Sequence, residues 1–175
     1  AEIVIGVERS FEAVKRAREI ARTGRVAFHL KDEGDRGRYV DLDAKDLVRP
    51  NVEFICGDAA ALPLPAACAD TIVAANLLDR LRRPAEFLER ADRALRPGGR
   101  MVLAMPFTWR EATTDRDRWI GDAERSGREA LLTAFDDHDY EVEETDELGL
   151  LIRNHRRAYE WIRPLMVRAR KGGDS

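Results

Sequence analysis

The sequence lacks an apolar run that approaches the roughly 20 residues needed to cross a bilayer. Its start, AEIVIGVERS, has neither a basic leader nor a long apolar stretch, so it does not fit a secretory signal peptide. Cysteine is scarce as well, because Cys56 and Cys68 are the only two and their spacing suits no metal site. So few thiols exclude a disulfide-based scaffold and favour a soluble protein of the reducing cytoplasm.

Blocks of like charge, internal repeats and low-complexity segments are also missing. The 30 Lys and Arg residues nearly balance the 33 Asp and Glu residues, and the two signs are mixed along the chain. This distribution argues against nucleic acid as a partner. A chain of 175 residues can bury one sizeable core. We therefore expect one domain over residues 1–170, followed by a polar tail at residues 171–175.

Apolar runs that are typical of strands alternate with stretches that have helical spacing. The expected strands lie at 3–7, 52–56, 70–75 and 101–105. The expected helices run from a Ser10 cap to Gly24, from Pro84 to a stop at Pro97-Gly98-Gly99, and through Leu131, Leu132 and Phe135. This alternation predicts an α/β protein with an open, mostly parallel sheet.

The rest of the chain is less regular. Residues 31–51 are polar and rich in charge, which predicts a surface insertion or an excursion of weak strands. Further extended segments are expected at 140–145, 148–153 and 161–169, the last with Pro164 inside it. Gly98 and Gly99 follow a helix and precede a strand, which is the wrong order for a phosphate loop, so they indicate a structural turn.

Polar residues follow three of the expected strands, and in open α/β sheets ligands bind beyond the carboxyl ends of strands. Glu8 can accept both hydroxyls of a ribose, or it can be an acid that favours the following helix dipole. Asp58 and the backbone amide of Ala59 can hold an adenine, although Asp58 also suits a turn. Asn76 offers a donor and an acceptor where substrates meet, or it caps the next segment.

The histidines and aromatic residues give weaker signals. His29, His138 and His155 are scattered, and isolated histidines are more often structural than catalytic. Phe107 and Trp109 lie just past a strand end, where a substrate lid would be, and Trp109 is the better candidate for substrate packing.

Four segments in order, VIGVERSFEAVKRA, GDAAALPLP, ADTIVAANLLDRL and RALRPGGRMVLAMPF, resemble the motifs that follow the glycine loop of class I S-adenosylmethionine methyltransferases. This resemblance implies a Rossmann-like methyltransferase fold with an antiparallel C-terminal strand. ANLLDRL, PFTW and LLIRNHRRAYEW are further similar to the 4-mercaptohistidine (5-thiohistidine) imidazole-N-methyltransferase domain of ovothiol biosynthesis. The likeness covers nearly the whole chain.

The resemblance also implies roles for particular residues. Glu8, with Arg9 beside it, would hold the ribose of S-adenosylmethionine, and Asp58 and Ala59 would hold its adenine. Asn76 would lie at the border between cofactor and acceptor as a cofactor-binding and catalytic residue. The residues expected to bind the substrate are Phe107, Trp109, Arg153 and His155.

The implied reaction is attack of a neutral imidazole nitrogen on the sulfonium methyl group. The protein mainly aligns the atoms, and a strong base is unnecessary because imidazole is largely neutral near pH 7. If a base is used, His155 is the first candidate. The resemblance further implies a thiol-bearing histidine as substrate and a sulfoxide synthase domain, fused or paired, as partner.

Two features depart from the family pattern. The strand and the Gly-x-Gly loop that cradle the methionine part of the cofactor would precede Ala1. That strand would lie between 3–7 and 70–75, so we expect the chain as given to bind S-adenosylmethionine poorly and to be marginally stable. Pro164 is the second departure, since it falls in a strand that such sheets pair on both sides.

Three alternatives remain open from the sequence. A nicotinamide-dependent oxidoreductase also uses an acid after its second strand, but it gives no reason for GDAAALPLP. Quinone or sterol methyltransferases share the central motifs and would act on another small molecule. A non-catalytic methyltransferase-like binding module is the third.

Overall fold

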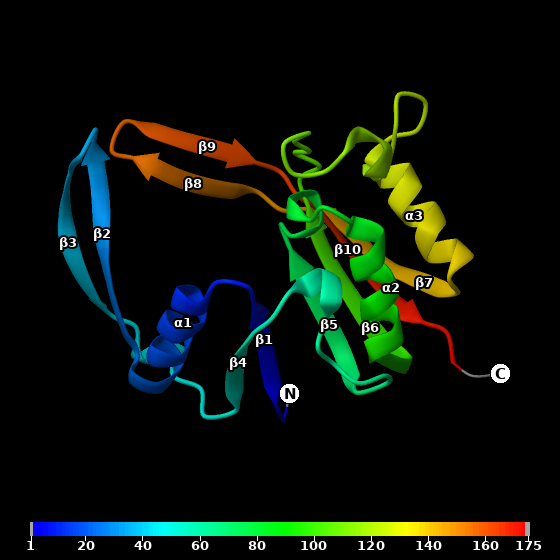
Figure 1. Cartoon of the computed structure of the whole chain (residues 1–175), viewed down its shortest axis with the longest axis horizontal. Helices are drawn as coiled ribbons and strands as arrows, with labels where there is room; N and C mark the ends of the chain where they lie inside the picture. Colours follow the sequence, from blue (N-terminus) through cyan, green and yellow to red (C-terminus); the bar gives the residue numbers. More distant parts are fainter. Residues whose placement is uncertain (1, 174–175) are drawn as a thin grey trace. The chain divides into compact units, whose positions relative to one another are not determined.

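The computed structural model describes residues 2–173, and the chain forms two compact units (Figure 1). Unit 1 comprises the residues up to Ala59 together with Leu151–Trp161. Unit 2 comprises Ala60–Leu150 and the residues from Ile162 onward. Within the described part, no helix is both long and apolar enough to span a membrane.

Unit 1 contains two adjacent parallel strands, β1 (Val4–Glu8) and β4 (Val52–Cys56). Helix α1 (Phe11–Thr23) follows β1 and starts where the Ser10 hydroxyl accepts the Ala13 N–H at 3.3 Å. It ends at Gly24, whose φ of 66° is left-handed and whose N–H donates to the Ile20 carbonyl. The predicted helix between Ser10 and Gly24 is confirmed.

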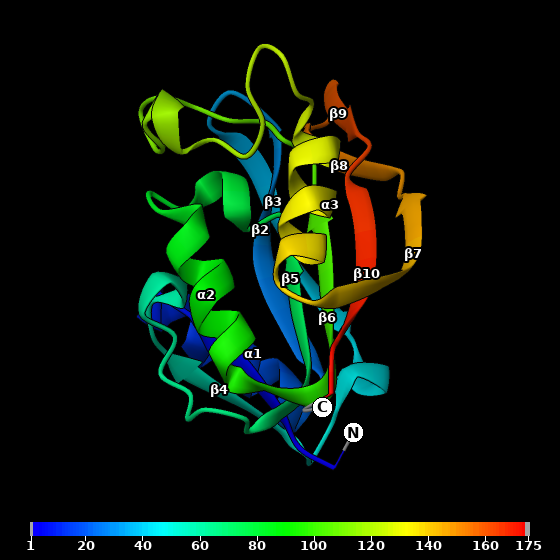
Figure 2. The same ribbon diagram turned by 90° about the vertical axis from the view of Figure 1, so that its right-hand side faces the viewer.

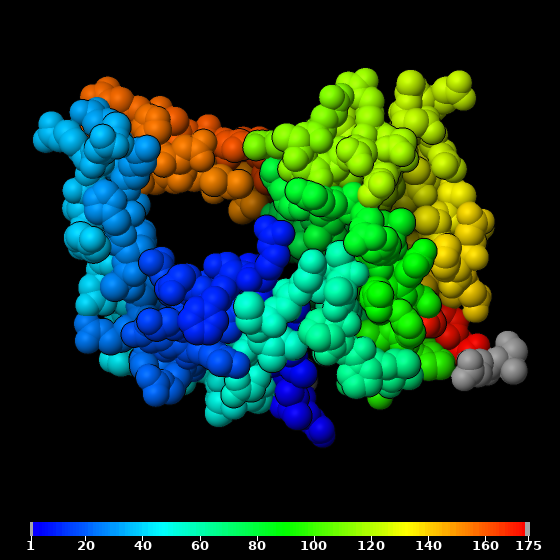
Figure 3. Space-filling model, viewed as in Figure 1, coloured from blue at the N-terminus to red at the C-terminus, as the bar shows by residue number. Residues whose placement is uncertain are grey.

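The polar segment of unit 1 is a β-hairpin. Strands β2 (Arg25–Glu33) and β3 (Arg36–Asp43) pair antiparallel, and a short 3-10 turn, η1 (Lys45–Leu47), leads toward β4. The expectation of weak strands is confirmed, but the hairpin begins at Arg25, directly after α1. A second hairpin, β8 (Leu150–His155) with β9 (Ala158–Ile162), meets the first at the outer ends of both (Figure 3).

Unit 2 contains a four-stranded sheet in the order β5 (Ala69–Ala75), β6 (Leu95–Met105), β10 (Leu165–Lys171) and β7 (Tyr140–Glu147). β5 and β6 are parallel, whereas β10 is antiparallel to both of its neighbours. Helices α2 (Pro84–Ala94) and α3 (Gly127–Asp137) lie over one face of this sheet (Figure 2). Short 3-10 turns η2 (Ala59–Ala61), η3 (Leu78–Arg80) and η4 (Arg116–Arg118) lie in the connections. The α/β class is confirmed, with strands of mixed orientation.

The apolar core lies in unit 2. Its largest fully buried apolar side chains come from β6, β10, α3 and the turn after β5: Leu78, Leu95, Met101, Leu103, Met105, Leu131 and Val167. Val14 of α1 is the only buried apolar side chain among the described residues of unit 1. Burial of apolar area therefore stabilises unit 2 far more than unit 1.

Two sequence-based expectations about prolines are corrected. The Pro97-Gly98-Gly99 segment does not stop α2, because the helix ends at Ala94 and Leu95, only 1% exposed, already belongs to β6. The last carbonyls of α2 are instead taken by the N–H groups of residues 67 and 68. Pro164 does not interrupt a strand, since β9 ends at Ile162 and β10 begins at Leu165.

The expected polar tail starts later than predicted. Lys171 is the last residue of β10, and its ammonium group lies 2.9 Å from the Asp92 carboxylate. Residues 174–175, which belong to the predicted tail, and Ala1, before which the glycine loop was expected, lie outside the described residues.

Candidate functional site

In unit 1 the carboxyl ends of β1 and β4 lie next to each other. Glu8 and Cys56 are register partners, and the Gly57 N–H donates to the Glu8 carbonyl at 3.1 Å. Glu8 and Asp58 therefore follow adjacent parallel strands, and both are exposed. In an open α/β sheet this is the edge at which ligands bind.

Glu8 has a structural contact beside its predicted role. Its Oε1 atom accepts the Ser10 N–H at 2.7 Å, just before the first turn of α1. A helix-flanking role is thus present in the structure, while the exposed carboxylate also remains accessible to a ligand. The neighbouring Arg9 is exposed, and its carbonyl accepts the Cys56 thiol at 3.3 Å. Ala59, half-buried, starts η2 directly after Asp58.

In unit 2 the carboxyl ends of β5 and β6 carry two residues with unusual backbone. Asn76 has a φ of 52° and Phe107 a φ of 53°, and both are L-residues in the left-handed region. Such strain costs on the order of 1–3 kcal/mol and clusters at functional sites. The Asn76 N–H donates to the Ala104 carbonyl at 2.7 Å, which ties the two strand ends together. Asn76 is not a helix cap, because η3 has Leu77 in that position without a side-chain bond.

Within residues 2–173, two acceptor oxygens at this end of unit 2 are buried without a hydrogen-bond partner: Oδ1 of Asn76 and Oδ1 of Asp79. The Asp79 side chain is 0% exposed, and its other oxygen accepts both the N–H (3.0 Å) and the hydroxyl (2.6 Å) of Thr108. Buried acceptors without donors are costly, so they call for an explanation. Sequence reasoning missed Asp79, although a single acid inside the apolar ANLLDRL segment was a usable signal.

The predicted lid aromatics are held within unit 2. The Phe107 ring packs so closely on Gly127, at the start of α3, that a Cβ there would lie 2.4 Å from it. Trp109 stacks on Trp119, with ring centroids 6.1 Å apart and planes 10° apart. The Trp119 indole N–H donates to the carbonyl of the fully buried Thr114 at 2.9 Å. These contacts order the loop after β6, and substrate packing by Trp109 stays a prediction.

Arg153 and His155 lie on β8, in the hairpin that meets the β2–β3 hairpin. The Arg153 guanidinium donates to Asp32 at 3.3 Å, and the Arg156 N–H donates to the Asp32 carbonyl at 3.0 Å. The His155 Nδ1 atom accepts the Arg157 N–H at 3.2 Å, which leaves Nε2 for any other partner. Arg153 therefore has a structural contact that the sequence did not predict.

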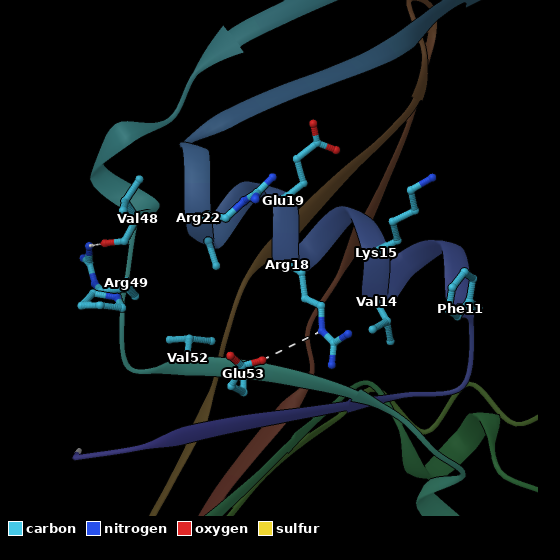
Figure 4. Close-up of a pocket in the computed structure, with 12 residues that line it drawn as sticks. Phe11, Val14, Lys15, Arg18, Glu19, Arg22, Val48, Arg49, Val52 and Glu53 are labelled. Atoms are coloured by element: carbon cyan, nitrogen blue, oxygen red, sulfur yellow. Dashed lines mark hydrogen bonds and ion pairs between the residues drawn. The ribbon is translucent and has the colours of Figure 1, made fainter.

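Two hollows of the structure do not contain the predicted site residues. A groove of about 1010 Å³ lies between α1 and residues 48–53, lined by Phe11, Val14, Arg18, Val52 and Glu53 among others (Figure 4). A smaller hollow of about 170 Å³ lies between α2 and α3 over Met101. The candidate site is thus assigned from strand ends and buried acceptors.

The family described as methyltransferase domain matches residues 1–103, which is more than half of the chain. The chain belongs to the class I S-adenosylmethionine-dependent methyltransferases. S-adenosylmethionine is accordingly its cofactor, and the nicotinamide-dependent alternative is set aside. At the sequence level, no curated protein matches the chain.

Solved structures agree with this methyltransferase fold. A SAM-dependent methyltransferase from Methanosarcina mazei is 18% identical with a TM-score of 0.62, covering 98% of this chain and 82% of its own. Another, from Aquifex aeolicus, is 18% identical with a TM-score of 0.53, covering 96% and 68%. The [4+2]-cyclase SpnF is 17% identical with a TM-score of 0.60, covering 98% and 67%. These likenesses show the fold alone.

Proposed function

We propose that this methyltransferase transfers the methyl group of S-adenosylmethionine to an imidazole nitrogen of 5-thiohistidine (4-mercaptohistidine), the N-methylation of ovothiol biosynthesis. The observation that carries the proposal is the ANLLDRL segment, in which Asn76 and Asp79 present buried acceptor oxygens that accept no hydrogen bond from any described residue. A ligand that brings N–H groups would satisfy them. The likeness of PFTW and LLIRNHRRAYEW to the ovothiol enzymes supports the same substrate.

The residues present fit the cofactor in this scheme. Glu8 has an exposed carboxylate at the end of β1, suited to the two ribose hydroxyls, with Arg9 beside it. Asp58 and the Ala59 amide, which follow β4, would hold the adenine. Asn76, at the end of β5, would border the reacting atoms. When bound, S-adenosylmethionine supplies an activated methyl group.

The protein's part in the reaction is alignment. The acceptor must present a neutral ring nitrogen in line with the methyl carbon, and imidazole is largely neutral near pH 7. We assign Phe107 and Trp109 to substrate packing, and Arg153 and His155 to the amino-acid end. If a base is used, His155 is the candidate: its Nδ1 atom, which accepts the Arg157 N–H, has the lone pair of the neutral ring, and Nε2 has the proton.

The proposed substrate also implies a partner domain and a cell compartment. We propose that a sulfoxide synthase domain, fused or paired with this chain, supplies the thiol-bearing histidine. Cys56 and Cys68 are both free and exposed, which suits the reducing cytoplasm.

The experiment offers 5-thiohistidine and histidine together to the protein with S-adenosylmethionine and identifies the products by mass spectrometry. We expect N-methylated 5-thiohistidine in large excess over methylated histidine. A parallel reaction with Asn76→Ala serves as the control and should form much less product. Equal or reversed preference would contradict the proposed substrate and point to another small-molecule methyltransferase.

A further inference from the structure

We infer that Asp79 recognises the acceptor ring: its Oδ1 atom accepts the N–H of the imidazole nitrogen that is not methylated. The inference rests on the proposed function and adds a residue and a role to it. Asp79 belongs to η3, directly after β5, three residues beyond Asn76.

The carboxylate of Asp79 is oriented by one of its oxygens and left open at the other. Oδ2 accepts the Thr108 N–H at 3.0 Å and the Thr108 hydroxyl at 2.6 Å. These two bonds fix the plane of the carboxylate, and they join η3 to the loop after β6. Oδ1 is buried and accepts no hydrogen bond from any described residue. The side chain is therefore a preoriented acceptor without a donor.

The ion-pair partner of Asp79 Oδ1 is the partly exposed Arg80. The Nε atom of Arg80 lies 3.8 Å from Oδ1, too far for a hydrogen bond, and this side chain is 46% exposed. Its Nη2 atom makes only a long contact of 3.4 Å with the Thr108 hydroxyl. Arg80 forms an ion pair with the carboxylate but no hydrogen bond to Oδ1, so a substrate N–H can take its place while the guanidinium turns to water.

The chemistry of imidazole explains why such an acceptor is useful. A neutral imidazole has one N–H donor and one nitrogen with a free lone pair. A carboxylate that accepts the N–H fixes which nitrogen keeps the lone pair, orients the ring, and stabilises the positive charge that develops on it. As the lone pair forms the bond to the methyl carbon, the carbon–sulfur bond breaks toward sulfur and leaves S-adenosylhomocysteine. The ring is then an imidazolium whose N–H proton Asp79 holds until it passes to solvent.

The test compares two acceptors in the protein and its variants. The first acceptor is 5-thiohistidine, and the second is the matching thiazole amino acid, in which ring sulfur replaces the N–H. Asp79→Asn keeps the shape of the side chain and an acceptor for Thr108 but removes the charge. We expect kcat/KM for 5-thiohistidine to fall about 10- to 100-fold and the preference over the thiazole to shrink by a similar factor. Affinity for S-adenosylmethionine, measured by calorimetry, should not change.

Two further variants separate recognition from a structural role. Thr108→Val removes the hydroxyl bond to Oδ2 and the long contact with Arg80, but the Thr108 N–H still donates to Oδ2, so the preference for the N–H acceptor should stay intact. Arg80→Met removes the competing cation at the surface, and it should lower KM for 5-thiohistidine several-fold. This second variant tests the inference even if Asp79→Asn unfolds.

The outcomes are distinct. Loss of the preference in Thr108→Val, full preference in a folded Asp79→Asn, or a raised KM in Arg80→Met would each overturn the role of Asp79. Those results leave the proposed function standing, because the unmodified protein still methylates 5-thiohistidine. If the unmodified protein does not methylate 5-thiohistidine at all, both the proposed function and this inference are overturned.

Discussion

Gly24 is the residue at which the chain turns from α1 into the first hairpin. It has a φ of 66°, and a Cβ there would lie 2.6 Å from the Cα atom of Lys45. Gly34, in the hairpin turn, has a φ of 51° with nothing within 4 Å of a Cβ. We expect Gly24→Ala to lower the free energy of unfolding by about 2–4 kcal/mol and Gly34→Ala by only about 1 kcal/mol. Urea denaturation measures both, and equal losses would show that Lys45 moves aside at no cost.

The roles of residues that contact neighbours close in the sequence were predictable. The roles of residues whose partners are distant in the sequence were not. Ser10 and Gly24 bound their helix as predicted, because capping depends on atoms within four residues. Asp79 was missed because its partner, Thr108, lies 29 residues away and only the fold brings the two together. Asn76 was expected as a possible cap, but its backbone is left-handed and its N–H donates to the Ala104 carbonyl of β6, which is 28 residues away.

Strand β7 carries a bulge that matters for the stability of the sheet in unit 2. The pairing of β7 with β10 shifts between Arg168 and Ala169, which leaves Glu143 as the extra residue. The Glu143 carboxylate accepts hydrogen bonds from Arg100 of β6 and Arg168 of β10, each as short as 3.0 Å. Because the hydrogen bond from Arg100 and the nearby positive charges favour the ionised form, the pKa of Glu143 is lowered.

This lowered pKa predicts a pH-dependent contribution of Glu143 to stability. A carboxyl group whose folded pKa is depressed stabilises the fold above its ordinary pKa and loses that contribution as the pH falls through the folded pKa. We expect Glu143→Gln to unfold at a lower urea concentration than the unchanged protein at pH 7. This difference between the two unfolding midpoints should become smaller toward pH 3. Glu160→Gln on β9, which makes no ion pair among residues 2–173, is the matched control. A gap that stays constant with pH would contradict the role of the charge.

At the scale of elements, the sequence predicted the strands that carry continuous apolar runs and the helices with caps. Strands β1, β4, β5 and β7 begin within a residue or two of the expected positions. The errors arose where tertiary contacts decide the boundary. Leu95 is buried in the core of unit 2, so β6 starts before Pro97. Pro164 lies between two strands because the chain passes there from the β8–β9 hairpin into the four-stranded sheet.

At the scale of the whole molecule, the proposed cofactor residues fall in both compact units. Glu8, Asp58 and Ala59 belong to unit 1, and Asn76 belongs to unit 2. Unit 2 has the large core, whereas β1 of unit 1 leaves apolar side chains open to solvent, with Val4 42% and Ile5 50% exposed. Fold class and family were predictable because they depend on the order of strands, helices and motifs. The substrate remains a proposal, since it depends on a few side chains at the strand ends.

Glu8 offers the sharpest test of the cofactor assignment in unit 1. Glu8→Gln keeps an acceptor for the Ser10 N–H, so α1 should remain capped and the melting temperature should hold. The substitution removes the charge, and with it the stronger hydrogen bonds that a carboxylate makes to two ribose hydroxyls. We expect the Kd of the protein for S-adenosylmethionine, measured by calorimetry, to rise about 10-fold or more. Glu12→Gln, in the exposed first turn of α1, removes the same charge without touching the strand end and should leave the Kd unchanged. If both variants keep the affinity of the unchanged protein, Glu8 serves only the start of α1 and the ribose is held by another residue.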